Sequence, residues 1–321
     1  MAGPQRARAA VAGMESSGDV GEEVRFVVLS EDGVAAEDEA ADVEVLWRHG
    51  RPERRWTEAA IASLPNLEWV HSDFVGVDVL PLDEFRSRGI LLTNGAGNYS
   101  RPMAEWVLLA MLAAVKRFPT VVRSSDRGVW QLPGTLDELW GKTVLMLGFG
   151  TVHQIVAPLA EAMGMEVVAT ARRPREHLPA GVTRWAQGDE WRRELHRSDF
   201  VVVGLPHTPE TDRIVDGEVF GRMKEGAWLV NLARGSLVDE RALVDALDAG
   251  RLGGALLDSF VEEPLPEDHP LWRRPNVIVV PHHSWSSHQV MVRIEDLFRR
   301  QLTAWASGEE LDNVVDLSAG Y

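Results

Sequence analysis

The sequence predicts an α/β protein with two domains, each built around a parallel sheet. Short apolar runs of strand length alternate with segments of helix length from residue 24 onward, which is typical of strand–helix–strand units. A glycine turn also joins an apolar run to a helical segment near the middle of the chain. At 321 residues, the chain is long enough for two domains of ordinary size.

The first part of the chain supplies the elements of the first expected sheet. Four segments have the composition of strands, namely residues 24–30, 43–47, 67–71 and 90–93. Helical patterns separate them at residues 57–64 and 80–88. A further helix is expected at residues 101–118, where the chain is apolar almost all round. Such a helix suits burial between domains or between subunits.

The second series of elements begins just before the glycine turn. We expect six strands, at residues 142–147, 166–170, 200–205, 228–232, 254–257 and 277–280. A helix at residues 154–163 follows the turn, and helical segments separate most of the later strands. The last helix, residues 287–306, is long enough to cross back to the first domain.

The composition of the chain excludes several classes of binding partner and several kinds of site. The formal charge of −16 argues against nucleic acid or an anionic membrane surface as a general partner. The chain has no cysteine, so disulfides, thiolate nucleophiles and Cys-ligated metals are excluded. No stretch has the length of a membrane span, and residues 1–23 lack the apolar core of a signal peptide. We expect a cytoplasmic protein with a flexible tail at residues 1–23, in which Met14 is an alternative start.

The glycine turn has the chemistry of a phosphate-binding loop. Gly148 and Gly150 would permit a tight turn and a close approach of the backbone to phosphate. A third glycine normally allows the helix to pack close to the strand, and His153 occupies that position. The imidazole could tilt the helix or project toward the phosphate in a protonated form. The alternative is a local adjustment that costs some stability.

The end of the next strand bears on the choice of cofactor. A protein that prefers NAD usually has a carboxylate there to hold the ribose hydroxyls. This chain has Ala171 followed by Arg172, Arg173 and, two residues later, Arg175. Arginines would bind the 2′-phosphate of NADP(H) through charge-assisted hydrogen bonds. We therefore favour NADP(H), with NAD(H) possible; the alternative is a solvated basic turn.

Three polar side chains follow three different strands of the second series. Arg234, Glu263 and His282 lie in the loops after residues 227–230, 255–257 and 277–280. Because ligands gather at the carboxyl ends of parallel strands, the three can share one crevice. An arginine can bind a substrate carboxylate, and a carboxylate beside a histidine fixes its tautomer for acid–base catalysis.

These segments resemble the D-isomer-specific 2-hydroxyacid dehydrogenase family, which includes glyoxylate/hydroxypyruvate reductases and phosphoglycerate dehydrogenases. The resemblance covers about residues 24–315. In the first part it is carried by residues 74–78, 89–90 and 94–105. In the second part it is carried by residues 148–153, 205–211, 231–236, 258–265 and 281–282.

The resemblance implies a role for each matching residue. His282 would donate the proton to the substrate carbonyl, Glu263 would orient it, and Arg234 would bind the substrate carboxylate. The backbone of Val75 and Gly76 would also hold that carboxylate. Thr151 and Val152 would contact the pyrophosphate, Leu205 and Pro206 the adenosine side, and Asp258 the nicotinamide amide. Together with the glycine turn and the basic turn after residue 170, the expected cofactor contacts are Gly148, Phe149, Gly150, Thr151, Val152, His153, Ala171, Arg172, Arg173, Leu205, Pro206, Thr211, Leu232, Ala233, Asp258 and Ser284.

The resemblance also implies an architecture. Two Rossmann-like or flavodoxin-like domains would face each other across a cleft. The substrate-binding domain would comprise residues 24–119 and 290–321, and the NAD(P)-binding domain residues 120–289. Family members are commonly homodimers, and the tryptophan-containing stretch at residues 130–140 is consistent with a partner surface. No metal is expected.

Several residues depart from the family pattern or extend the pocket. His283, Ser284 and Trp285 follow His282, where the family commonly has a small apolar residue and then Gly or Ala. Trp285 could shape the pocket or serve only in packing. Further pocket candidates are Trp47, Arg48, His49, Tyr99 and Arg101; Arg101 could instead pair with Glu105.

The predicted function is the reversible reduction of a small 2-keto acid to a D-2-hydroxy acid with NADPH. The alternative is a dehydrogenase fold that binds nucleotide or another protein with little turnover. The altered loop at His153 is the one feature that supports this alternative.

Overall fold

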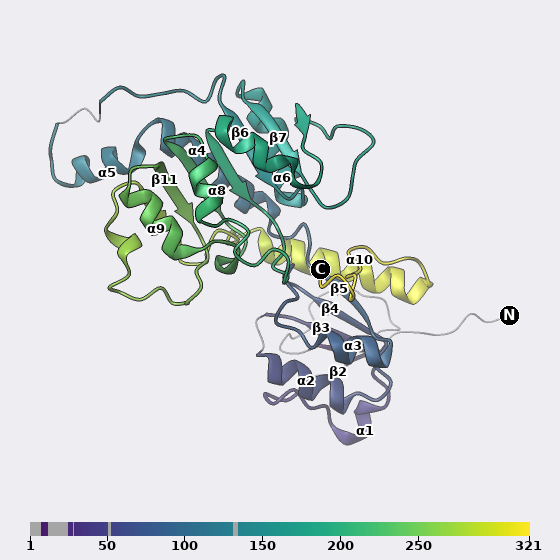
Figure 1. Cartoon of the computed structure of the whole chain (residues 1–321). Helices are drawn as coiled ribbons and strands as arrows, with labels where there is room; N and C mark the ends of the chain where they lie inside the picture. Colours follow the sequence, from purple (N-terminus) through teal and green to yellow (C-terminus); the bar gives the residue numbers. More distant parts are fainter. Residues whose placement is uncertain (1–7, 12–24, 28, 51–52, 131–133) are drawn as a thin grey trace. The chain divides into compact units, whose positions relative to one another are not determined.

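The computed structural model describes residues 8–11, 25–27, 29–50, 53–130 and 134–321 (Figure 1). It divides into two compact units, Met1–Asn98 with Ser287–Tyr321, and Tyr99–Ser286. Each contains one parallel sheet, so the expected α/β fold is confirmed. No helix in the described part of the chain is both long enough and apolar enough to cross a bilayer.

The first unit contains a five-stranded sheet in the order β2-β1-β3-β4-β5. All of its strand pairs are parallel. Its core brings together Leu46, Ile61, Val70 and Phe85 from different elements. The elements are β1 (Arg8–Val11), β2 (Arg25–Val27), α1 (Glu37–Ala40), β3 (Val45–Arg48), α2 (Arg54–Ser63), β4 (Trp69–Ser72), α3 (Leu82–Arg88), β5 (Leu91–Asn94) and α10 (Val290–Ser307).

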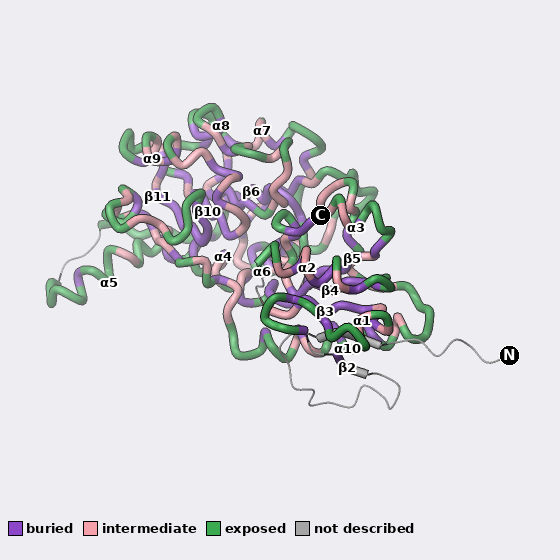
Figure 2. The backbone as a smooth tube through the Cα atoms, turned by 90° about the horizontal axis from the view of Figure 1, so that it is seen from below, coloured by how far each residue is buried: buried purple, intermediate pink, exposed green. Residues whose placement is uncertain are grey.

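The second unit contains a seven-stranded sheet in the order β12-β11-β10-β9-β6-β7-β8. Its central strands are buried (Figure 2). The strands are β6 (Thr143–Leu147), β7 (Glu166–Thr170), β8 (Arg184–Trp185), β9 (Phe200–Val203), β10 (Ala227–Asn231), β11 (Leu252–Leu257) and β12 (Val277–Val279). The α-helices are α4 (Ser100–Val115), α5 (Phe118–Asp126), α6 (Thr151–Ala162), α7 (Trp191–Glu194), α8 (Gly217–Arg222) and α9 (Glu240–Asp248), and the 3-10 turns are η1 (Gly188–Glu190), η2 (Leu195–Arg197), η3 (Gly235–Leu237) and η4 (Pro270–Arg273).

The observed fold differs from the expected one within residues 1–23 and at the domain boundaries. Strand β1 lies within residues 1–23, which were expected to form a flexible tail; its backbone pairs with both β2 and β3. The remainder of that stretch lies outside the described residues. Helix α4 belongs to the second unit rather than to the first domain, because its buried face packs against the core around α6 and β6. The expected boundaries at residues 119 and 289 therefore move to 98 and 286.

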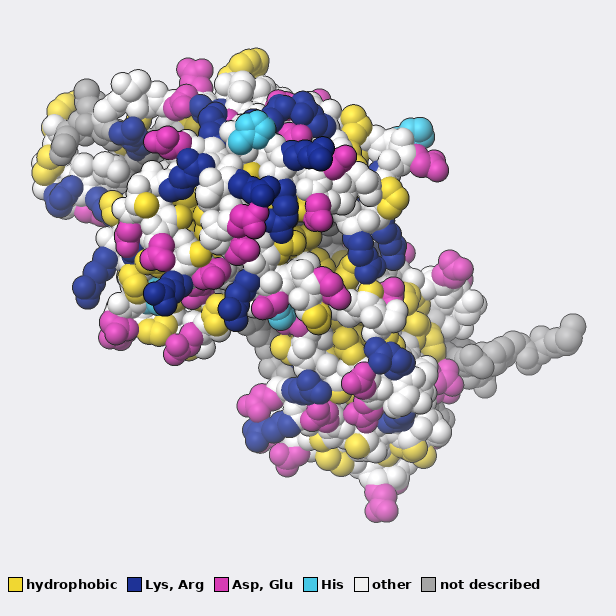
Figure 3. Space-filling model, viewed as in Figure 1, with side chains coloured by type: hydrophobic (Ala, Val, Ile, Leu, Met, Phe, Trp, Pro, Cys, Tyr) yellow, Lys and Arg dark blue, Asp and Glu magenta, His cyan; other side chains and the backbone are white. Residues whose placement is uncertain are grey.

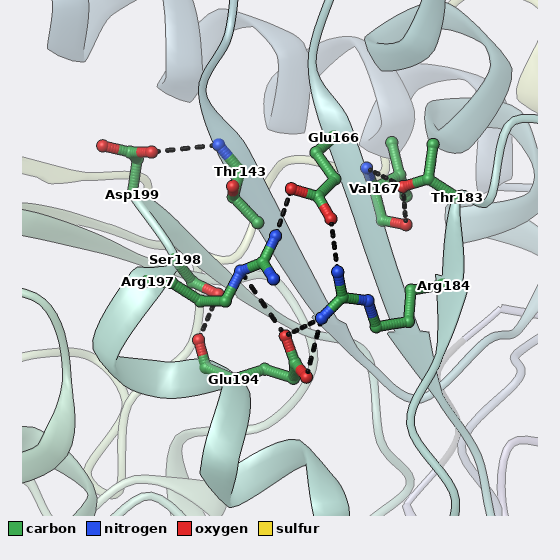
Figure 4. Close-up of polar contacts among 9 residues, drawn as sticks. All are labelled: Thr143, Glu166, Val167, Thr183, Arg184, Glu194, Arg197, Ser198 and Asp199. Carbon is green, nitrogen blue, oxygen red and sulfur yellow. Dashed lines mark hydrogen bonds and ion pairs between the residues drawn. The ribbon is translucent and has the colours of Figure 1, made fainter.

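Ion pairs fasten the amino-terminal edge of the seven-stranded sheet (Figure 4). Arg184 of β8 bonds Glu166 of β7 at 3.0 Å and Glu194 of α7 at 3.3 Å. Arg197 pairs with the same two carboxylates. At the neighbouring strand, Asp199 accepts a hydrogen bond from the Thr143 N–H at 2.9 Å. These contacts join β8 to β7 and α7, and β6 to the residue before β9, at the edge opposite the candidate site.

Candidate active site

The three predicted catalytic loops leave neighbouring strands at one edge of the seven-stranded sheet. Asn231, at the end of β10, pairs with Leu257 of β11, and Leu257 pairs with Val279 of β12. The loops that carry Arg234, Glu263 and His282 therefore start side by side, as the sequence predicted from the parallel arrangement.

His282 and Glu263 form a direct pair. Nδ1 of His282 lies 2.7 Å from Oε2 of Glu263, and Oε1 of Glu263 accepts a hydrogen bond from the Phe260 N–H at 2.9 Å. The imidazole is partly exposed, at 28%. With Nδ1 engaged by the carboxylate, Nε2 is the ring nitrogen available to a ligand.

The backbone of His282 adopts an unusual conformation that its neighbours support. Its φ is +48°, in the left-handed region that residues with side chains seldom adopt. The His282 N–H donates to the Val280 carbonyl at 2.9 Å, and Nε1 of Trp285 donates to the His282 carbonyl at 2.9 Å. Trp285 thus fastens the loop. It also contacts Tyr99 in a T-shaped arrangement with ring centroids 6.0 Å apart.

Asp258 holds the same loop through hydrogen bonds from the two residues after His282. The carboxylate is 2% exposed, and its Oδ1 accepts hydrogen bonds from the N–H groups of His283 at 2.8 Å and Ser284 at 3.0 Å. Its Oδ2 accepts from the Ser284 hydroxyl. Burial raises the pKa of Asp258, and the hydrogen bonds from Ser284 and His283 oppose that rise. This positioning role was missed at the sequence level, because it joins loops 25 and 26 residues apart.

The Arg234 loop is shaped by Asn231 and Gly235. Asn231 accepts a hydrogen bond from the Ala233 N–H at 3.1 Å and donates to the Arg234 carbonyl at 2.8 Å. A Cβ at Gly235 would lie 2.1 Å from the carbonyl carbon of Phe260, so only glycine permits this approach. The approach presses the Arg234 loop against the loop that begins at Phe260 and leads to Glu263.

The glycine loop fits a phosphate on two counts. Gly148 has a φ of +86°, and a Cβ there would lie 2.6 Å from the Gly204 carbonyl oxygen, so glycine is required. A Cβ at Gly150 would have no neighbouring atom within 4 Å, which leaves the space above the loop open to a ligand. Helix α6 begins directly afterwards at Thr151, and its first N–H groups suit an anion. The helix starts three residues earlier than residue 154.

The side chain of His153 does not project toward the phosphate position. It is 2% exposed, and its Nδ1 lies 2.6 Å from the Gly148 carbonyl oxygen. Burial lowers the pKa of His153 to about 4, so the ring is neutral near pH 7. Of the alternatives for His153, the protonated imidazole that projects toward the phosphate is therefore wrong, and the side chain expected among the cofactor contacts lies in the interior.

The other predicted cofactor residues divide into exposed and buried sets. Phe149, Leu232 and Ser284 are buried, so their side chains support the site from within. Thr211 closes its own turn by donating to the Pro206 carbonyl at 2.7 Å. The partly or fully exposed residues at the carboxyl edge are Gly150, Thr151, Val152, Ala171, Arg172, Arg173, Leu205, Pro206 and Ala233.

Basic side chains surround the end of β7. Arg172 and Arg173 are exposed directly after Ala171. Arg172 acts electrostatically on Glu210, whose pKa is lowered chiefly by a hydrogen bond from Thr208 and also by this arginine. The Arg175 guanidinium lies 5.6 Å from the ring centroids of both Phe149 and Trp185. Figure 3 shows that basic and acidic side chains are mixed over the visible surface.

In the first unit, the predicted substrate loop is held by Asn94. Its side chain donates to the Val75 carbonyl at 3.1 Å, and the Val75 side chain is exposed. Neither the Val75 nor the Gly76 N–H donates a hydrogen bond to another residue that the structure describes. Both are therefore available donors for a carboxylate.

The remaining pocket candidates of this unit surround Asp73, which sequence reasoning missed. The buried carboxylate accepts hydrogen bonds from Nε1 of Trp47 at 2.6 Å and the Gly50 N–H at 3.1 Å. Nδ1 of His49 lies 2.8 Å from it, and that contact raises the pKa of His49. Arg48 is buried and donates to Thr57 at 3.0 Å. Trp47 and Arg48 are thus largely committed to the interior.

Within the described ranges, no group of three or more His, Asp or Glu side chains could hold a metal ion. The candidate site consists of the His282–Glu263 pair, the Arg234 loop and the glycine turn at one edge of the seven-stranded sheet.

Comparison with known proteins shows the family of this chain. The sequence pattern of the D-isomer specific 2-hydroxyacid dehydrogenase NAD binding domain matches residues 108–284. A glyoxylate/hydroxypyruvate reductase B from Pectobacterium carotovorum is 34% identical over 259 residues, which are 78% of this chain and 80% of that protein. A D-3-phosphoglycerate dehydrogenase from Methanocaldococcus jannaschii is 32% identical over 306 residues, which are 93% of this chain and 56% of that longer protein.

The fold is shared with solved structures as well. A D-isomer specific 2-hydroxyacid dehydrogenase from Xanthobacter autotrophicus, solved with NADPH and MES, superimposes with a TM-score of 0.82. It is 28% identical, and the alignment covers 98% of this chain and 99% of that one. This chain therefore belongs to the D-isomer specific 2-hydroxyacid dehydrogenase family.

Proposed function

We propose that the protein is an NADPH-dependent reductase that interconverts a small 2-keto acid and a D-2-hydroxy acid. The observation that carries this proposal is the 2.7 Å contact between His282 and Glu263 at the sheet edge that also bears the glycine loop. A protein that only binds nucleotide has no need for an oriented imidazole with an available Nε2.

Proton transfer in this proposal belongs to His282. Glu263 accepts the hydrogen bond from Nδ1–H, which fixes the ring and leaves Nε2–H to protonate the carbonyl oxygen. Glu263 also stabilises the imidazolium that forms when the reaction runs in the oxidative direction. A bound nicotinamide supplies the hydride for the carbonyl carbon.

Substrate binding rests on donors for its carboxylate. Arg234 has the bidentate geometry that suits a carboxylate, and its loop is fixed by Asn231 and Gly235. In the first unit, the N–H groups of Val75 and Gly76 are donors that also suit a carboxylate. Small 2-keto acids such as glyoxylate and hydroxypyruvate suit this set, and the relative from Pectobacterium carotovorum is named for these two acids.

NADPH is favoured over NADH because arginines follow β7 where an NAD-preferring protein would have a carboxylate. Arg172 and Arg173 are exposed there, and their guanidinium groups suit a 2′-phosphate. The neighbour from Xanthobacter autotrophicus was solved with NADPH. NADH would bind in the same loop with lower affinity.

We also propose a homodimer. Helix α5 and the segment after it expose apolar side chains, among them Phe118, Val121, Val122 and Trp130, and Trp130 is 100% exposed. Apolar side chains grouped in this way favour association with a partner. A second copy is the simplest occupant, because homodimers are the commonest oligomers.

The test is NADPH oxidation followed at 340 nm with glyoxylate, hydroxypyruvate and bulkier 2-keto acids, with chiral analysis of the product. A D-2-hydroxy acid and a rate that depends on His282 would support the proposal. Tight NADPH binding by calorimetry with no turnover across the panel would instead indicate the nucleotide-binding alternative.

A further inference from the structure

His153 and Gly204 fit together as a complementary pair. A Cβ at Gly204 would lie 2.6 Å from Cε1 of His153 and within 3.1 Å of both ring nitrogens. The imidazole therefore occupies volume that is available only because residue 204 has no side chain. Gly204 follows β9, the strand next to β6, so the ring is accommodated beneath the two loops at this edge of the sheet.

The ring is also bonded to the first glycine of the loop. Its Nδ1 lies 2.6 Å from the Gly148 carbonyl oxygen. A carbonyl can only accept, so Nδ1 carries the proton and donates it. The ring is buried, which favours its neutral form and keeps this donor in place near pH 7.

This hydrogen bond sets the orientation of one peptide group. In a trans peptide the C=O and the following N–H point in opposite directions. Because the Gly148 carbonyl points inward to His153, the Phe149 N–H points away from the buried ring. That N–H donates to no residue among those that the structure describes. It precedes Gly150 and the first turn of α6, so it joins the donors available to a phosphate.

We propose that His153 is a positioning residue for the pyrophosphate of the cofactor. A third glycine would let the helix pack close to the strand. His153 provides a hydrogen bond in its place, and this bond holds the Gly148–Phe149 peptide in an orientation that suits phosphate binding. Gly204 provides the space for the ring. The inference rests on the proposed use of NADP(H), and it predicts an effect on the pyrophosphate and none on the adenosine end.

The first experiment compares His153→Asn with His153→Leu. Asparagine can place an amide N–H near the position of Nδ1, whereas leucine has similar bulk and no donor. We expect His153→Leu to raise the Kd for NADPH about tenfold and its KM by a similar factor, with kcat little changed. His153→Asn should restore most of the affinity.

A fragment of the cofactor separates positioning from general damage. Adenosine 2′-monophosphate lacks the pyrophosphate, so its Kd should be the same for the parent protein and for His153→Leu. Equal weakening of NADPH and of this fragment would overturn the proposal, as would unchanged NADPH affinity in a folded His153→Leu variant. Failure of the parent protein to bind NADPH would instead refute the proposed cofactor.

The pairing with Gly204 has its own test. Gly204→Ala should weaken NADPH binding and lower the melting temperature, because the new methyl group forces the ring to move. His153→Ala leaves a cavity, and the double variant lets the alanine at residue 204 occupy part of it. We expect the double variant to lose less stability than the sum of the single variants. Strict additivity would refute the proposed fit between the two residues.

Discussion

Oε2 of Glu263 lies 2.7 Å from Nδ1 of His282, although the two residues are 19 positions apart in the chain. The contact depends on the Phe260 N–H, which bonds the other oxygen of Glu263 at 2.9 Å. It also depends on Asp258, which binds the backbone directly after His282. Glu263 thus orients the His282 ring, and the buried Asp258 holds the two residues that follow it.

Removing either member of this pair should lower kcat. Loss of the proton donor in His282→Ala should reduce kcat by about 10²- to 10⁴-fold, since general acid catalysis contributes on that scale. Glu263→Gln should have a smaller effect, because the ring remains but loses its charged partner. Steady-state kinetics with NADPH and glyoxylate would measure both. Glu262→Gln is the matched control, and full activity in His282→Ala would refute the assigned role.

Arg234 should control recognition of the substrate carboxylate. Arg234→Lys keeps the charge but loses the bidentate geometry, so we expect kcat/KM for the keto acid to fall about 10- to 100-fold. The Kd for NADPH, measured by fluorescence, should stay unchanged. Arg241→Lys on α9 is the control. An equal loss of cofactor affinity would point to a structural defect rather than to substrate binding.

Arg172 should contribute to the preference for NADPH. We expect Arg172→Ala to lower the ratio of kcat/KM for NADPH to that for NADH by about tenfold, through loss of a charge-assisted contact with the 2′-phosphate. Arg222→Ala, on α8, is the control. If the ratio does not move, the same measurement on Arg173→Ala and Arg175→Ala decides whether another arginine binds the phosphate; Arg175 is already held between Phe149 and Trp185.

Acid should destabilise the protein through two buried histidines. Burial lowers the pKa of both His71 and His153 to about 4 from an ordinary 6.5. The unfolded chain therefore binds more protons than the folded one, and the free energy of unfolding falls as the pH drops from about 6.5 toward 4. Each histidine contributes up to roughly 3 kcal/mol of that loss.

The contribution of His49 to the free energy of unfolding changes with pH in the opposite direction, because Asp73 raises the pKa of His49. Its contribution is fully present below about pH 6.5 and is lost as the pH rises through its higher folded value. Denaturant unfolding at pH 7, 5.5 and 4.5 would measure the net effect of these histidines on the free energy of unfolding. His153→Asn, which cannot titrate there, should have a shallower acid loss than the parent protein; an identical slope would contradict the assignment.

The exposed apolar side chains around α5 should mediate self-association. We expect the parent protein to sediment as a dimer and Phe118→Asp to shift it toward monomer, because a charge in an apolar interface is costly to desolvate. Leu178→Asp, at an exposed leucine outside this group, is the control. A monomeric parent protein at micromolar concentration would refute the proposed dimer.

The sequence by itself determined the parallel α/β class, most strands and the loops of the site. Strand Glu166–Thr170 has the expected bounds, and Arg234, Glu263 and His282 follow neighbouring strands. These features are local: apolar runs, glycine turns and polar residues at strand ends leave a signal within a few positions. Pairing of parallel strands then places their carboxyl ends at one edge.

Only the tertiary structure decided what distant residues do to one another. It buried His153 against Gly204, bonded Asp258 to the backbone of His283 and Ser284, and placed α4 in the second unit. A helix that is apolar on every side does not indicate which core it will join. A histidine at the third glycine position gives the same sequence pattern whether its ring faces the phosphate or the protein interior. Its environment is set by a glycine 51 positions away, and that environment makes it a neutral donor to the loop.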